Sequence, residues 1–241
     1  RDRGTSVAIP ERRMVADKDL VIDMECSLED TVLIKSIFEE AWEDKSVALF
    51  IPGTSIKGVL RHHCNHILQV LGRGHKTVDM LFGYSDDGSK ESRKGRLMVD
   101  EVYFDRSFTQ EEQPRIRVDR FTGGAMNGAL FQDHPVRKEK GKQLVFPLRM
   151  TVKDCSDSEA GLVLLLVKDL MTGQITLGAN RTIGYGRIKG NSVTVQYHGE
   201  SYSIDGTGKV TEGEATKLEA LIQVLHQSTE DTMLAKEGAH E

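Results

Sequence analysis

The fold is decided by a stretch in which a short apolar segment runs into a helix, Leu49-Phe-Ile-Pro-Gly-Thr-Ser-Ile-Lys-Gly-Val-Leu-Arg61. Within it, Thr54 and Ser55 are good helix N-cap residues. The residues that then recur at helical spacing are Ile56, Val59, Leu60, His63, Ile67 and Leu71. Because Gly72 and Gly74 end this pattern, the stretch predicts a helix that follows a strand.

Strand and helix patterns alternate outward from this helix. The other predicted strands are 20–26, 31–34, 96–104, 144–152 and 192–197, and the other predicted helices are 158–171 and 213–236. Residues 35–46 and 84–95 are polar or acidic and are expected to be loops. The order β-α-β-(insertion)-β-α-β is typical of a ferredoxin-like, RRM-like α+β domain. The insertion at 105–142 is too long for a plain connection, and 115–120 has the pattern of a hairpin arm.

Length and composition fit an ordinary globular protein of 241 residues, 38% hydrophobic and 29% charged. We expect an N-terminal arm or linker at 1–18, one domain at 19–197 and an acidic C-terminal helical extension at 198–241. The polar arm suggests a module of a longer fusion or a subunit with an extension. No apolar run approaches the ~20 residues that a membrane span needs, so no membrane partner is expected. Three cysteines, an odd number far apart in the chain, favour a reducing, cytoplasmic setting.

Charge is distributed unevenly along the chain. The net charge is −5, which by itself argues against binding to nucleic acid. Residues 57–190, however, carry 22 basic and 16 acidic side chains, while both ends are acidic. Local charge matters more than the total to a polyanion, so the middle of the chain is compatible with RNA binding. Each basic cluster could equally be solvated surface.

The first motif, 51–61, combines features of an anion site. Gly53 permits a close backbone approach, and Thr54 and Ser55 open a helix whose N–H groups can face a phosphate. Lys57 and Arg61 lie four residues apart on one helix face. The alternative is a capped surface helix without a ligand. The spacing of a Walker A motif is missing.

Two further glycine-rich motifs have the residue types that bind nucleic acid. In 177–190, Arg181, Arg187 and Lys189 supply charge among four glycines, and Tyr185 could stack on a base. This segment could instead be a tight hairpin. In 118–131, the apolar residues Phe121, Met126, Leu130 and Phe131 surround three glycines of a flexible tip, beside Arg120 and Thr122. Exposed apolar tips can act as wedges between bases, although the loop could also pack on its own domain.

Candidates for catalysis are acidic residues and histidines. Glu39, Glu40, Glu43 and Asp44 precede the first motif, where a carboxylate could hold a metal such as Mg²⁺ near a nucleic-acid backbone. A solvated acidic loop is the favoured alternative. The group His62, His63, Cys64, His66 and His75 matches no common zinc spacing, and structural histidines are favoured. No nucleophile triad is discernible.

Together the three motifs resemble the RAMP superfamily of CRISPR-associated proteins, in the family's order. Ile51–Arg61 is similar to its "IPGSSLKG..LR" segment, and Val118–Phe131 to its "DR.TG.A..G.LF" thumb segment. Leu177–Arg187 is similar to its C-terminal glycine-rich loop, and Leu81–Gly83 and Arg96–Asp100 also fit. The likeness spans about 20–197, and the backbone subunits of type III effectors are the most similar members.

This resemblance implies a ferredoxin-like palm that carries a β-hairpin thumb. Such subunits stack along CRISPR RNA, and the thumb inserts into the guide–target duplex. In many of them an acidic residue before the "IPG" segment cuts target RNA with a divalent metal. This chain has Leu33-Ile34-Lys35 where the family usually has a glycine-containing turn. Asp44 matches a later, non-catalytic aspartate, and Glu39 or Glu40 lies nearer the cleaving position.

The leading hypothesis is therefore a guide-RNA-binding backbone subunit of a type III ribonucleoprotein effector in antiviral defence. Its partners would be CRISPR RNA, target RNA and other RAMP subunits. The residues expected to bind RNA are Gly53, Thr54, Ser55, Lys57, Arg61, Arg120, Phe121, Thr122, Met126, Arg181, Tyr185 and Arg187. Two alternatives remain open: a metal-dependent endonuclease for target RNA that uses Glu39, Glu40 or Asp44, and a metal-independent guide-processing endonuclease that uses His62, His63 or His75.

Overall fold

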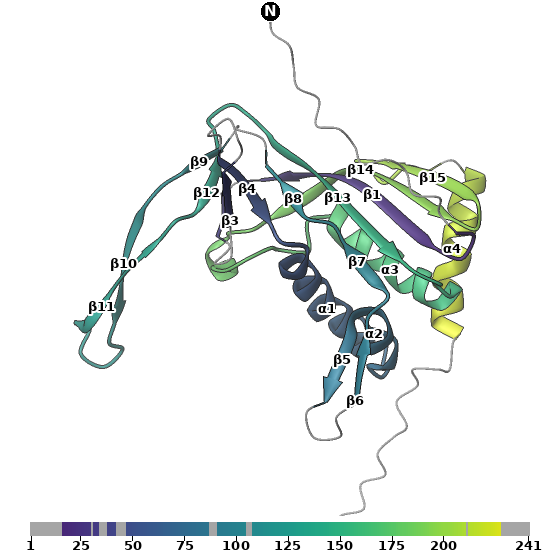
Figure 1. Ribbon diagram of the computed structural model, residues 1–241, viewed down its shortest axis with the longest axis horizontal. Helices are drawn as coiled ribbons and strands as arrows, with labels where there is room; N and C mark the ends of the chain where they lie inside the picture. The colour runs from purple at the N-terminus through teal and green to yellow at the C-terminus, as the bar shows by residue number, and fades with distance from the viewer. Residues whose placement is uncertain are drawn as a thin grey trace, which may run out of the picture.

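The centre of the protein is a five-stranded antiparallel sheet (Figure 1). The computed structural model describes residues 16–29, 31–33, 38–41, 47–86, 91–104, 108–210 and 212–227. The strands of the sheet, in spatial order, are β15 (Glu200–Asp205), β14 (Ile188–Tyr197), β1 (Leu20–Leu28), β13 (Leu144–Val152) and β7 (Leu97–Val99). Mixed helices and antiparallel sheets confirm the predicted α+β class.

Helices lie along one side of this sheet (Figure 1). Along the chain, helix α1 (Gly53–Val70) lies between β1 and β7, and α3 (Asp157–Met171) lies between β13 and β14. Helix α2 (Lys76–Phe82) follows α1, and α4 (Glu212–Gln227) packs against α3. The start of α3 has a capping box, in which Ser156 accepts from the Glu159 amide and the Glu159 carboxylate accepts from the Ser156 amide.

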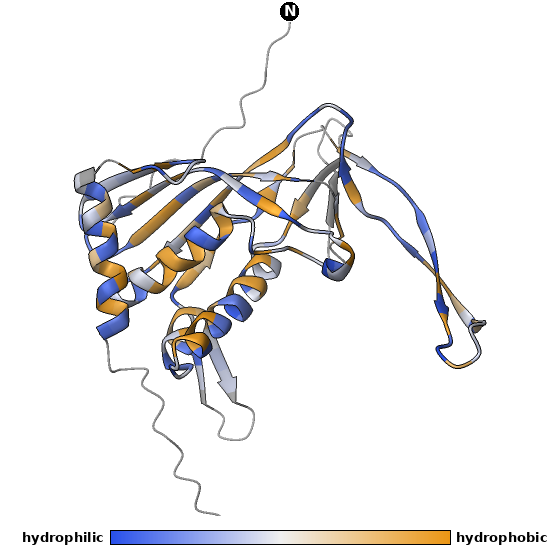
Figure 2. Cartoon of the chain, turned by 180° about the vertical axis from the view of Figure 1, so that it is seen from behind, coloured by the Kyte–Doolittle hydropathy of each residue, from blue (hydrophilic) through white to orange (hydrophobic). Residues whose placement is uncertain are grey.

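The core follows from the alternation of buried and more exposed residues along β13, whereas β1 is buried along most of its length. In β13, Leu144, Phe146, Leu148, Met150 and Val152 are buried, while the residues between them are more exposed. The buried side chains face α1 and α3, and Figure 2 shows apolar residues gathered in these strands and helices. The opposite side is mixed, since Val21 and Val145 lie there beside polar residues. On it Arg149 forms an ion pair with Asp23 of β1 at 3.4 Å.

Smaller sheets surround the main one. One contains β3 (Phe38–Ala41), β4 (Val47–Ile51) and β8 (Val102–Tyr103). Another contains β2 (Thr31–Val32), β12 (Val136–Lys138) and β9 (Phe108–Gln110). Two hairpins complete the fold, β5 (Gly83–Asp86) with β6 (Glu91–Lys94), and β10 (Gln113–Val118) with β11 (Ala125–Asp133). The second hairpin projects from the body (Figure 1).

Several local expectations are wrong. Residues 38–41 form strand β3 within the expected 35–46 loop, because 47–51 offers them a partner strand. The expected 84–95 loop includes the β5–β6 hairpin, and the expected strand 96–104 is two short strands in different sheets. These differences share a cause, since pairing between strands is decided by tertiary contacts and leaves a weak trace in local sequence.

The C-terminal segment is joined to the same core. Strand β15 pairs with β14 along its length, and Leu218 and Leu225 of α4 are buried. Gly161 of α3 allows this contact, because a Cβ there would overlap the Leu221 backbone. Arg73, itself buried, donates to the His226 carbonyl at 2.7 Å at the end of α4. None of the described helices is long and apolar enough to cross a membrane.

Candidate nucleic-acid interface

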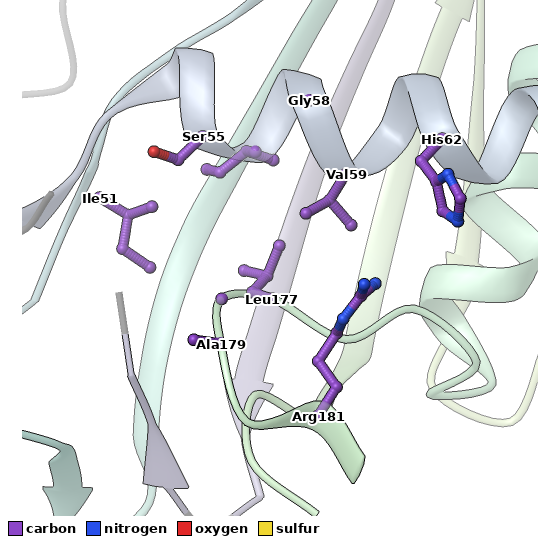
Figure 3. A pocket seen from close by; sticks show the side chains of 10 residues that line it. Ile51, Ser55, Gly58, Val59, His62, Leu177, Ala179 and Arg181 are labelled. Carbon is purple, nitrogen blue, oxygen red and sulfur yellow. The ribbon is translucent and has the colours of Figure 1, made fainter. Parts of the chain in front are cut away.

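A groove of about 440 Å³ brings together the first and second glycine-rich motifs (Figure 3). One wall is helix α1, which contributes Ser55, Gly58, Val59 and His62. The other wall is the segment 177–181, from which Arg181 extends toward α1. Residues more than a hundred positions apart in the chain therefore line one open surface.

Glycines hold the two walls in place from within. Gly53 is buried, and a Cβ there would overlap the Val99 carbonyl of β7. Gly186 is also buried at φ +78°, and a Cβ there would overlap the Leu177 carbonyl. The close backbone approach at Gly53 is therefore made by the protein's own β7, and Gly186 likewise contacts the protein's own backbone. RNA binding at Gly53 stays a prediction.

The start of α1 also differs from expectation. The N-cap residue is Pro52, with no side-chain capping bond, and Thr54 and Ser55 lie in the first turn. Proline has no side-chain acceptor for the amides of the first turn, and the Ser55 amide instead donates to the Pro52 carbonyl at 2.9 Å. Thr54 is exposed and Ser55 partly exposed. The expectation that they cap the helix is therefore wrong, and their contact with RNA stays a prediction.

The second motif ends in an exposed loop at the mouth of the groove. Asn180 adopts φ 60° and Gly184 φ 93°, and between them Arg181–Ile183 form a single 3-10 turn. Arg181, Thr182 and Ile183 are all exposed. Arg181 forms no ion pair with any carboxylate in the described part of the chain. Its guanidinium is thus free to meet an anion in the groove.

A second hollow of about 400 Å³ continues from the groove to the base of the β10–β11 hairpin, and the two share Ala179. Arg115 of β10 forms an ion pair with Asp133 of β11 at 2.8 Å. The Tyr185 hydroxyl donates to Gln113 at 3.1 Å and accepts from Arg115 at 3.3 Å. These bonds tie the glycine-rich loop to the root of the hairpin.

This network gives Tyr185 a role that the sequence did not suggest. Its ring lies against the Arg115 guanidinium, 5.9 Å from ring centroid to Cζ, so one face of the ring is already engaged. Asn180 joins the network by donating to Asp133 at 3.3 Å. Asn180, Gln113 and Asp133 were missed, because only the tertiary structure brings the loop and hairpin together.

The tip of the β10–β11 hairpin presents apolar side chains to solvent. Phe121 is 100% exposed, and Met126 and Leu130 are also exposed. The turn is held by the Asp119 carboxylate, which accepts from the amides of Phe121 at 2.7 Å and Thr122 at 3.1 Å. These bonds hold the pKa of Asp119 below its ordinary value. The third motif therefore protrudes, as predicted.

The other cationic candidates lie around this surface. Arg120 is exposed at the hairpin tip, and Arg187 is exposed beside Glu29, with 3.6 Å between Nε and Oε2. Lys57 and Arg61 do not line the groove. They lie on the other flank of α1, where Arg61 donates to Asp79 and to the Gly83 carbonyl, both at 2.7 Å. The residues of the first motif, 51–61, therefore lie on two different flanks of α1.

The structure describes only the backbone of two of the acidic candidates for catalysis. Glu39 and Glu40 lie in β3, opposite Leu49 and Ala48, and Asp44 lies outside the described residues. No cluster of three or more His, Cys, Asp or Glu side chains fit for a metal occurs within the described ranges. Cleavage of target RNA with Mg²⁺ by Glu39, Glu40 or Asp44 therefore stays a prediction.

The histidines and cysteines have separate surroundings. His63 is bonded to Asp169 of α3 at 2.7 Å, His75 to Asn65 at 2.9 Å, and His62 lines the groove. These three histidines form no shared site. The three cysteines are free and buried, and burial raises the pKa of the Cys26 thiol to about 12.

The open face of the main sheet differs from the usual RNA-binding sheet. RRM domains stack bases on exposed aromatic residues of the sheet. Here the aromatic residues of the five strands, Phe146, Tyr197 and Tyr202, are buried. Asp23 and Glu25 add negative charge to that face. The groove and the hairpin, rather than the sheet, are the surfaces suited to RNA.

Comparison with known families agrees with this arrangement. The family model of the RAMP superfamily matches residues 36–189, which include α1, the hairpin and most of the glycine-rich loop. The chain belongs to the RAMP superfamily. This membership confirms the resemblance seen in the three motifs.

Solved structures extend the comparison of this RAMP protein. A chain in the cryo-EM structure of the type III-B Cmr-beta bound to cognate target RNA matches with a TM-score of 0.51 and 15% identity. The match covers 75% of this chain and 62% of that chain, so the RAMP protein spans less than two thirds of its neighbour's length. At this identity the likeness concerns the fold. A search of curated proteins gave no match.

Proposed function

We propose that this RAMP protein is a guide-RNA-binding backbone subunit of a type III CRISPR effector. The observation that carries the proposal is the groove between α1 and 177–181, which adjoins the root of an exposed apolar hairpin. A ribose-phosphate strand would lie in the groove, with a phosphate at Arg181. Its partners would be CRISPR RNA, target RNA and neighbouring subunits, in cytoplasmic antiviral defence.

In this proposal the main sheet with α1 and α3 is a ferredoxin-like palm. Its strand order β14-β1-β13-β7, joined through α1 and α3, supports that assignment. The β10–β11 hairpin is the thumb. Phe121 and Met126 at its tip are exposed apolar groups of the kind that wedge between bases and unstack them. The thumb would therefore distort a guide–target duplex that lies along the palm.

Binding of the guide strand is expected to be mostly electrostatic. Phosphate contacts contribute affinity without reading sequence, and each contact releases counterions. Arg181 is the exposed, unpaired guanidinium of the groove within the described ranges. Ser55 and His62 add polar groups from α1. Affinity should therefore fall steeply with salt and vary little with base sequence.

The test is the substitution Arg181→Ala in the full chain. We expect weaker binding of single-stranded RNA, with the slope of log affinity against log salt reduced by about one. Fluorescence anisotropy over a range of salt concentrations measures both quantities. Lys209→Ala is the matched control, because Lys209 is exposed in the loop after β15, outside the groove. Equal affinity and equal salt slope for Arg181→Ala and the wild type would contradict the proposal.

A further inference from the structure

Helix α1 has two flanks that differ in what faces them. Ser55, Val59 and His62 line the groove with Arg181. Lys57 and Arg61 lie one turn apart on the other flank, toward the β5–β6 hairpin. Between the flanks, Gly58 is exposed on the crest of the helix. Gly58 therefore lies at the edge of the groove, between it and this second surface.

Arg61 links this second surface to the β5–β6 hairpin. One guanidinium nitrogen donates to the Gly83 carbonyl and the other to Asp79, so its charge is offset by a carboxylate. Gly83 pairs with Lys94 in the hairpin register. Lys94 therefore lies at the root of the hairpin, opposite Gly83, whose carbonyl accepts from Arg61.

Two lysines remain uncompensated at this point. Neither Lys57 nor Lys94 forms an ion pair with a carboxylate of the described residues. Burial lowers the pKa of Lys57 first, and the positive charges of Arg61 and Lys94 lower it further. Like charges gathered in this way would be stabilised by a bound anion.

The hairpin face that carries Lys94 is small and polar. In an antiparallel pair, side chains of alternate residues share a face, which places Ser85 and Ser92 on the same face as Lys94. The root is fixed in place, since a Cβ on Gly95 would overlap the Phe82 backbone. An exposed lysine on a face that it shares with two serines suits a phosphate oxygen.

Gly58 gives the connection between the two surfaces. Glycine within a helix is unfavourable relative to alanine, so its presence at this position needs a reason. Nothing in the protein lies within 4 Å of where its Cβ would be, so packing does not supply one. Because Gly58 has no side chain, the exposed surface of α1 is lower at this position, which leaves room for a strand to cross the helix.

We propose that an RNA strand crosses α1 over Gly58 and that Lys94 binds a phosphate beyond the crossing, beside Lys57, which the sequence already predicts to bind RNA. The inference rests on the proposed function, because it extends the path of the same strand. The ligand class is the phosphodiester backbone of single-stranded RNA. Arg61 acts as a positioning residue, which holds the hairpin so that Lys94 faces the strand.

The test compares single-stranded RNAs of two lengths in anisotropy titrations of the full chain. An oligonucleotide of about 12 nucleotides is long enough to cross the helix, whereas one of about 4 fills the groove alone. Lys94→Ala should weaken binding of the long RNA about three- to tenfold and reduce its salt slope by about one. Lys94→Ala should leave the affinity for the short RNA unchanged. Lys94→Arg, which keeps the positive charge, should retain the affinity for the long RNA.

Substitutions of Gly58 test the crossing independently. Gly58→Ala favours the helix, and Gly58→Leu adds bulk on an exposed crest, so both variants should fold as the wild type does. Gly58→Leu should weaken the long RNA more than the short one, and thermal unfolding verifies the fold. If Lys94→Ala and Gly58→Leu leave the long RNA unchanged while Arg181→Ala weakens it, the crossing is overturned and the proposed function stands. If Arg181→Ala also has no effect, both are overturned.

Discussion

Gly186 sets the position of the glycine-rich loop through its backbone alone. Its φ of +78° is unfavourable for any residue with a side chain, and the Leu177 carbonyl occupies the space of a Cβ. The Leu177 amide also donates to the Gly186 carbonyl at 2.8 Å. The loop that presents Arg181 therefore depends on one buried glycine.

Gly186→Ala is accordingly expected to lower the free energy of unfolding by about 2–4 kcal/mol, from combined backbone strain and overlap. Urea unfolding measures this change. Gly184→Ala is the matched control, because Gly184 also has positive φ but nothing within 4 Å of its Cβ position. It should cost only the strain, about 1–2 kcal/mol. Equal losses in the two variants would contradict the role of the Leu177 contact.

Asp19 makes stability depend on acid pH. Burial alone would raise the pKa of this carboxyl, but hydrogen bonds from Lys153 and from the Asp154 amide outweigh burial and hold it below 3.8. A pKa lowered by folding stabilises the protein above the unfolded value, and this stability is lost as the pH falls through the folded value.

Asp19→Asn should therefore remove part of the acid sensitivity. The wild type should lose stability between about pH 4 and pH 2, and the variant should lose less over the same window. Urea unfolding midpoints at a series of pH values provide the measurement. Asp17→Asn serves as control, because Asp17 is exposed two residues before Asp19 and its substitution removes the same charge from the same segment. The interpretation fails if Asp19→Asn and the wild type share one acid profile.

At the scale of elements, the β10–β11 hairpin is anchored at its root and free along its length. The ion pair of Arg115 with Asp133 and the bonds from Tyr185 hold the root. Beyond it Ile116, Val118 and Leu130 are exposed, and none belongs to the core. Beyond its root, the hairpin therefore projects from the body and does not contribute to the core.

Replacing 117–129 by a short turn should change the free energy of unfolding by about 0.5 kcal/mol or less, since exposed side chains contribute little. Single-stranded RNA should still bind in the groove. Distortion of a guide–target duplex, read by the fluorescence of a 2-aminopurine base in the assembled complex, should disappear. Phe121→Ala tests the tip within an intact hairpin and should reduce the signal. Full distortion by the shortened protein would refute the thumb role.

At the scale of the whole molecule, the acidic C-terminal segment and the basic middle of the chain lie in different parts of the protein. The acidic C-terminal segment forms β15 and α4, which lie at the far edge of the sheet from the β10–β11 hairpin (Figure 1). The basic middle of the chain supplies α1, the hairpin and the glycine-rich loop. The negative charge of the C-terminal segment is thereby kept away from the surface proposed for RNA.

Because α4 is part of the core, ending the chain after residue 211 should destabilise the whole protein. Leu218 and Leu225 would be lost from the α3 surface, and truncating buried leucines costs about 2–5 kcal/mol each. Thermal unfolding should show a much lower midpoint. A chain ending after 227 is the control and should unfold like the wild type, since Arg73 still finds the His226 carbonyl. Equal midpoints for the two chains would show that α4 is dispensable.

The sequence predicted most of the main sheet and its helices. Regular alternation in 144–152 and helical spacing from Ile56 are local signals that survive in the fold, because burial on one face selects them directly. The short strands β3, β5 and β15 were missed because their stability comes from a partner strand. For the candidate site, the exposed tip at Phe121 was predicted, and the groove brings parts of the first two motifs together. That these segments bind RNA stays a prediction.

What the sequence determined by itself is therefore the order of elements, the RAMP motifs and the uneven charge. Only the tertiary structure decided what each residue of those motifs faces. Helical spacing shows that Lys57 and Arg61 share a flank of α1, but not that the groove lies on the other flank. It cannot show that Gly53 and Gly186 serve internal packing while Gly58 meets open space. The period of an element fixes which side chains point together, whereas packing of distant segments fixes what stands opposite them.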